Sequence, residues 1–153
     1  MVSDSQRNDA ALVPQEVFQY ALLRVVPSLA RGEALNVGVV LHCRRRGFLG
    51  VATRLDRARL SALDPRLDVE QLERHLLALS RIAEGDETAG ALARMDRSER
   101  FGWIVAPAST LVQPSPVHTG LCLDPADMLA RMAAELLGPP DGPDPTGDRP
   151  VRC

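Results

Sequence analysis

Apolar side chains fall in short runs along the chain, and the spacing within each run predicts the element that it forms. Residues 18–26 (FQYALLRVV) are almost continuously apolar, which is typical of a buried strand. Residues 35–43 (LNVGVVLHC) have an apolar side chain at every second position, so these side chains are expected on one face of a second strand. Residues 48–54 (FLGVATR) predict a third strand. Only residues 44–47 separate the last two strands, which predicts a hairpin.

Helical spacing follows the hairpin. A short helix is expected over residues 57–63, because the Asp-Pro pair that follows it disfavours helical backbone. A longer helix is expected from Asp68, a good N-cap residue, to the glycine at position 85. Residues 101–105 (FGWIV) and 109–113 (STLVQ) predict two more short strands. A last helix is expected from Asp124, followed by proline, to Leu137.

This order of elements predicts an α+β fold. We expect a mainly antiparallel sheet of about five strands, with two or three helices packed on one face. Residues 16–137 are expected to form a single domain. Residues 1–15 are polar and residues 138–153 are rich in proline and glycine, so both ends are expected to be disordered.

The composition excludes several kinds of enzyme. All 18 basic residues are arginine, and the chain has no lysine. Phosphate-loop nucleotide hydrolysis, protein-kinase chemistry and Schiff-base catalysis each need a lysine amine. The sequence predicts no cofactor.

Positive charge is concentrated at the tip of the predicted hairpin, although the net charge of the chain is −2. Arg44, Arg45 and Arg46 are consecutive there. Guanidinium groups could bind phosphates or an acidic protein surface, whereas the simpler interpretation is a solvated loop tip. Nucleic-acid binding is only weakly supported, because Phe48 is the sole aromatic residue of the region and bases stack on aromatic rings.

The segment 113–120 (QPSPVHTG) gathers polar side chains on a backbone that two prolines hold extended, as an edge strand or an ordered loop. His118 could act as a general base, with Ser115 as a nucleophile or substrate contact. Gln113 and Thr119 are candidate binding residues. The alternative is that these side chains make hydrogen bonds within a turn.

A second polar group precedes the second strand. Glu33 could be a catalytic carboxylate or a metal ligand, and Asn36 could bind a ligand. Alternation places Arg24 on the same face of the first strand as Tyr20, where it needs a partner. The alternative is an ion pair from Glu33 to Arg24 or Arg31, with Asn36 making hydrogen bonds within a turn.

The cysteines predict neither a disulfide framework nor a zinc site. The chain has three, without a C-x-x-C pair. His42 and Cys43 are adjacent, so on a strand they point to opposite faces and cannot share a metal. A cytoplasmic location is expected, because no signal peptide or membrane span is recognisable. No metal and no membrane association are predicted.

Residues 20–41 (YALLRVVPSLARGEALNVGVVL) and 99–121 (ERFGWIVAPASTLVQPSPVHTGL), with LDP at residues 63–65 between them, resemble a bacterial family known as domain of unknown function 3037. The resemblance covers about residues 18–137. It implies no activity and no catalytic residues. Its gene context, similar to that found next to HipA-like kinases, implies a partnership with such a kinase. The two blocks contain Arg24, Glu33, Asn36, Gln113, Ser115 and His118.

The leading hypothesis is an accessory or protein-binding domain, with a HipA-like kinase as a candidate partner. One alternative is a small hydrolase or nuclease-like enzyme that uses His118 and Glu33. Another is an anion-binding or nucleic-acid-binding domain that uses the arginine hairpin. The sequence favours a binding role over catalysis and leaves the question of enzymatic activity open.

Overall fold

The computed structural model describes residues 14–108 and 110–138. In this part of the chain the elements are β1 (Glu16–Val25), β2 (Leu35–Cys43), β3 (Phe48–Thr53), α2 (Arg57–Leu63), α3 (Val69–Glu84), two short 3-10 helices (Glu87–Ala89 and Ala91–Arg94), α4 (Arg97–Ile104), β4 (Val112–Pro114), β5 (His118–Cys122) and α5 (Pro125–Leu136). The ends that were predicted to be disordered lie outside the described residues, apart from positions 14, 15 and 138.

The strands form one antiparallel sheet, and the α+β class is confirmed. The order is β3-β2-β1-β4, and β5 pairs with the N-terminal half of β1 while β4 pairs with its C-terminal end. The predicted hairpin joins β2 to β3. Gly47 closes its turn with a φ of +59°, and its amide donates to the carbonyl of Arg44.

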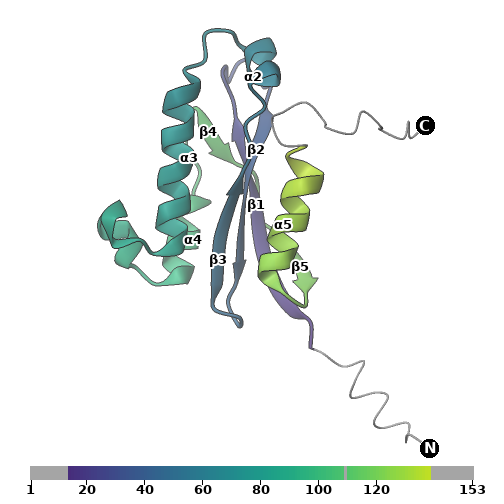
Figure 1. Ribbon diagram of the computed structural model, residues 1–153, viewed down its shortest axis with the longest axis vertical. Helices are drawn as coiled ribbons and strands as arrows, with labels where there is room; N and C mark the ends of the chain where they lie inside the picture. The colour runs from purple at the N-terminus through teal and green to yellow at the C-terminus, as the bar shows by residue number, and fades with distance from the viewer. Residues whose placement is uncertain (1–13, 109, 139–153) are drawn as a thin grey trace, which may run out of the picture.

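Helices cover both faces of the sheet, which corrects the prediction of a single covered face. Figure 1 shows α3 and α4 on one side of the sheet and α5 on the other. The reason lies in β1, where Ala21 and Leu23 belong to the core under α3 and α4, whereas Phe18 and Tyr20 face the core under α5. A strand that is apolar on both faces needs a covering layer on each.

A β-bulge in β2 corrects the predicted alternation of that strand. Leu23 pairs with Gly38 and Arg24 pairs with Asn36, so Val37 is the extra residue. Val37 therefore packs in the core under α3 and α4, while Val39 and Leu41 pack in the core under α5. The side chains predicted to share one face are divided between the two.

Residues 101–105 were predicted to form a strand, and this prediction is wrong. Most of them belong to the helix α4. The Asp96 carboxylate caps this helix by accepting from the amide of Glu99 at 2.9 Å. Phe101 and Ile104 lie one helical turn apart, and both are buried. A short apolar run has the same appearance in a buried strand and in a buried helix, so its period could not distinguish them.

The predicted strand over 109–113 is also shifted. β4 begins at Val112, and Ser109 lies outside the described residues. The proline-rich segment predicted as an edge strand or loop contains the end of β4 and the start of β5. Both of these strands lie at the edge of the sheet, where Pro114 and Pro116 remove amide donors.

Candidate functional site

Glu33 lies in the loop between β1 and β2 and is exposed. Its Oε1 atom forms an ion pair with Nη2 of Arg31 at 2.7 Å. Both side chains are largely solvated, so this pair contributes little to stability. The geometry is that of a surface ion pair.

Ser115 is buried and serves as a bridge to β1. Its amide donates to the carbonyl of Leu22 at 2.8 Å. Its hydroxyl accepts a hydrogen bond from the amide of Leu22 at 2.8 Å and donates to the carbonyl of Pro116 at 2.9 Å. Ser115 lies between β4 and β5. Its hydroxyl therefore satisfies the Leu22 amide of β1, which in a continuous strand pair would donate to a backbone carbonyl.

His118 begins β5 and packs on Tyr20, its partner in register on β1, with ring centroids 5.4 Å apart. Glu33 lies beyond the other end of β1, because Leu35 pairs with Val25. The five residues from Tyr20 to Val25 correspond to about 16 Å along the strand. The structure therefore does not bring His118 together with Glu33, and no catalytic pair is assembled from them.

Three of the candidate binding residues do meet. Arg24 is paired in register with Asn36 on β2 and with Gln113 on β4. These three side chains lie on the α5 side of the sheet, and we refer to them as the polar row. The Asn36 amide donates to the carbonyl of Leu136 at 3.4 Å, at the end of α5. The Nε atom of Arg24 is buried and has no hydrogen-bond partner among the described residues.

Sequence reasoning did not connect Arg54 with this region. Its Nη1 atom donates to the carbonyl of Gly138 at 2.7 Å, just after the end of α5. A guanidinium at this position complements the negative end of a helix dipole. Only the fold reveals the proximity of Arg54 to α5.

The hairpin arginines, Arg44, Arg45 and Arg46, are exposed as expected for a loop tip. Arg45 approaches the Glu16 carboxylate at 3.9 Å. Arg97, at the start of α4, adds a further positive charge beside the turn, because a side chain at Gly47 would meet its guanidinium. The predicted patch thus gains a member from a distant part of the sequence.

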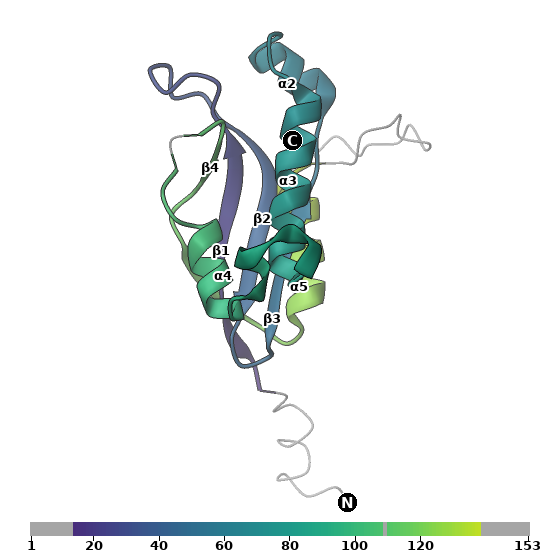
Figure 2. The same cartoon turned by 90° about the vertical axis from the view of Figure 1, so that its left-hand side faces the viewer.

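An uncovered part of the sheet adjoins the hairpin, and we call it the open face. The helices that cover the sheet pack mainly on β2 and β3. Figure 2 shows the N-terminal end of β1 extending beyond α4 on this side of the molecule. Val17 pairs with Leu121, and these side chains are 59% and 55% exposed. The open face consists of Val17, Gln19, Val117, Thr119, Leu121 and Leu123.

A cavity of about 390 Å³ connects the open face to the hairpin. Its lining includes Val17 and Gln19 from the open face, Arg44 and Arg45 from the hairpin, and His42. Thr119, a predicted binding residue, pairs with Gln19. The apolar side chains and the arginines therefore form one continuous surface.

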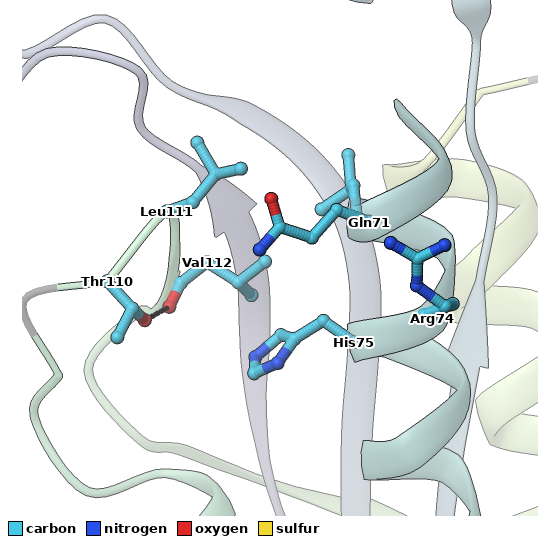
Figure 3. Close-up of a pocket in the computed structure, with 7 residues that line it drawn as sticks. Gln71, Arg74, His75, Thr110, Leu111 and Val112 are labelled. Atoms are coloured by element: carbon cyan, nitrogen blue, oxygen red, sulfur yellow. Dashed lines mark hydrogen bonds between the residues drawn. The ribbon is translucent and has the colours of Figure 1, made fainter. Parts of the chain in front are cut away.

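A larger groove of about 530 Å³ lies between α3 and β4. Figure 3 shows Gln71 and His75 of α3 pointing across it toward Val112 and Thr110. The Thr110 hydroxyl donates to the carbonyl of Val112 at 2.7 Å. Gln71 and His75 were not predicted as site residues, because they occupy the polar side of an amphipathic helix. Among the described residues that line this groove, no hydroxyl group is hydrogen-bonded to a base.

A comparison with family models matches residues 20–137 to the family described as "Protein of unknown function (DUF3037)". The match covers most of the chain and includes every residue of the polar row. The chain belongs to the DUF3037 family. No curated protein and no solved structure matches this DUF3037 chain.

Within the described part of this DUF3037 domain, no group of three or more histidine, cysteine or acidic residues could hold a metal ion. His42 belongs to the α4 side, where it packs on Phe101, whereas Cys43 and Cys122 lie in the core under α5. Burial and the neighbouring Cys43 raise the pKa of the Cys122 thiol, which keeps this sulfur in its unreactive form.

A helix that crosses a bilayer must be both long and apolar. In residues 14–108 and 110–138, no helix combines the length and the apolar content that a membrane span requires.

Proposed function

We propose that this chain is a protein-binding domain that docks a partner on the open face. The observation that carries the proposal is the uncovered apolar pair Val17 and Leu121, flanked by Val117 and Leu123. Single exposed apolar residues are common, whereas contiguous apolar patches mark interaction sites. The pair lies on a sheet, whose fixed backbone lowers the conformational entropy lost on binding.

The charge beside the open face indicates the chemistry of the partner. Arg44 and Arg45 line the cavity that joins the open face to the hairpin. Apolar residues at the centre of an interface with cations at its rim fit an apolar patch bordered by carboxylates. Because the family's gene context is similar to that found next to HipA-like kinases, an acidic surface of such a kinase is the partner that we propose.

Binding of the full chain to a HipA-like kinase encoded beside a family member tests this proposal, with isothermal titration calorimetry as the measurement. Leu121→Glu buries a charge at the centre of the interface, so the affinity should fall by about 30-fold or more. Arg44→Glu combined with Arg45→Glu should weaken the affinity and reduce its dependence on salt.

Leu77→Glu is the matched control, because Leu77 is 51% exposed on α3 and lies away from the open face. Its affinity for the kinase should equal that of the wild type. The proposal is overturned if the kinase does not bind at micromolar concentrations. It is also overturned if sedimentation shows a dimer of this chain that Leu121→Glu dissociates. A third contrary result would be that Arg44 and Arg45 are needed for binding to a DNA or RNA duplex but not for binding to the kinase.

A further inference from the structure

The polar row holds hydrogen-bond donors that the described residues leave without acceptors. None of the ion pairs among the described residues includes Arg24. Its Nε atom is buried and donates to nothing. A buried donor without a partner costs free energy comparable to that of a lost hydrogen bond, so an acceptor supplied by a ligand would stabilise this site.

Two amides flank the guanidinium. Asn36 and Gln113 are the register partners of Arg24 on opposite sides of β1, so all three side chains are cross-strand neighbours. The Asn36 amide has only a long hydrogen bond of 3.4 Å, and the Gln113 amide donates to the carbonyl of Thr110 at 3.2 Å. Each NH₂ group has a second hydrogen with which to donate to a ligand.

We propose that the polar row binds the carboxylate of a small organic acid. Arg24 offers the planar pair of donors that matches the two oxygens of a carboxylate, and the amides on both sides can complete the contact. This site goes beyond the proposed function, since it lies on the α5 side of the sheet and the open face lies on the α4 side.

The charge of the surroundings selects a carboxylate over a phosphate. Arg24 is the single cation of the row. Arg54, another arginine on this side, already donates to the carbonyl of Gly138, and the guanidinium of Arg59 lies beside the same glycine. The carbonyl of Leu136 also borders the row, at the C-terminal and partially negative end of α5. The single positive charge of the row itself matches a monoanion, and the neighbouring carbonyls disfavour a second negative charge.

The same chemistry could come from the chain itself. Asp141, Asp144 and Asp148 follow Gly138, whose carbonyl Arg54 contacts near the row. A carboxylate of the chain would compete with a free acid. Replacing these three residues by asparagine separates the two sources, because added acetate should bind more tightly to this variant if the chain supplies the competitor.

The test follows the Arg24 Nε–H resonance by NMR in the full chain during titration with acetate, propionate or inorganic phosphate. The resonance should shift saturably with the carboxylates. Asn36→Ala and Gln113→Ala should each weaken binding by about 10-fold, the effect of one hydrogen bond to a charged group. In the Arg24 variants the side-chain amide resonances of Asn36 and Gln113 report binding instead. Arg24→Gln should abolish binding, and Arg24→Lys should retain only part of it.

Arg31→Gln is the control, because Arg31 is an exposed arginine outside the row. It should bind acetate as the wild type does. Circular dichroism establishes that each variant is folded, and the wild-type titration stands even if Arg24→Gln fails to fold. Absence of a saturable shift in the wild type and in the asparagine variant overturns the proposal, as does tighter binding of phosphate than of either carboxylate. Unchanged kinase binding by Arg24→Gln separates this site from the open face.

Discussion

The imidazole of His42 packs against the ring of Phe101, with centroids 5.1 Å apart. His42 is only 5% exposed, and this contact joins β2 to α4. Burial lowers the pKa of His42 below its ordinary value of 6.5, and the positive charges of Arg44 and Arg97 lower it further, while Asp96 acts in the opposite direction. The folded protein therefore holds this ring neutral.

Stability should fall in mildly acidic solution because of His42. The unfolded chain takes up a proton on this ring as the pH falls through 6.5, whereas the folded chain, with its lowered pKa, does so only at lower pH. The free energy of unfolding, measured by urea titration between pH 8 and pH 5, should decrease, and the decrease should be smaller in His42→Leu. His75→Gln, which changes an exposed histidine, should keep the wild-type slope. An unaltered slope in His42→Leu would contradict this explanation.

Arg100 should stabilise the junction between α3 and α4. Its Nη1 atom donates to the carbonyls of Ile82 and Ala83, both at 2.9 Å, at the C-terminal end of α3. Arg100→Ala removes two buried charge-assisted hydrogen bonds and should lower the free energy of unfolding by about 2–3 kcal/mol in denaturant titrations. Arg81→Ala removes an exposed arginine near the C-terminal end of α3 and should change the free energy of unfolding by less than about 0.5 kcal/mol. Equal effects of the two substitutions would argue against this role.

Gly85 should be required beside Arg100. It ends α3 with a φ of +74°, and a Cβ atom there would lie 2.9 Å from Nη1 of Arg100. Gly85→Ala should cost about 1–2 kcal/mol for the left-handed backbone alone, and more while Arg100 is present. In a double-mutant cycle measured by urea unfolding, Gly85→Ala should therefore cost less in the Arg100→Ala background. Additive effects would show that the guanidinium does not limit this position.

Ser115→Ala distinguishes a structural from a chemical role for this hydroxyl. The substitution leaves the buried amide of Leu22 without its acceptor and should lower the free energy of unfolding by about 1–3 kcal/mol. Thr110→Ala, which also removes a hydroxyl bonded to a backbone carbonyl but at an exposed residue, should have a smaller effect. Wild-type stability of Ser115→Ala in urea titrations would contradict the bridging role.

The elements with explicit end signals could be predicted from the sequence. α2 was predicted at its observed bounds, and Asp68 and Asp124 cap α3 and α5 as their positions indicated. Residues 101–105 were assigned to a strand, because a short apolar run has no distinguishing period. The bulge at Val37 could not be foreseen either, since it depends on pairing with β1.

The candidate site was predictable in composition and not in arrangement. Arg24, Asn36 and Gln113 were selected because they are polar residues in strand-like surroundings, and the register of three strands makes them neighbours. Glu33 and His118 were selected on the same grounds, and the same register separates them. Which strands pair is decided by contacts between distant residues, and local patterns do not encode it.

Gly120 should be required for the packing of β5 on β1. It pairs with Phe18, and a Cβ atom at this position would lie 2.6 Å from the Phe18 ring. Gly120→Ala forces the ring to move within the core under α5, which should cost about 1–3 kcal/mol of unfolding free energy.

Phe18→Leu alone is also destabilising, but it opens space beside the new methyl group. Gly120→Ala should therefore cost less in the Phe18→Leu background than in the wild type, as measured by urea unfolding of the four proteins in a double-mutant cycle. Gly102→Ala is the control, because nothing lies within 4 Å of a Cβ atom there. If Gly120→Ala cost the same in both backgrounds, the Phe18 ring would not be what excludes a side chain from position 120.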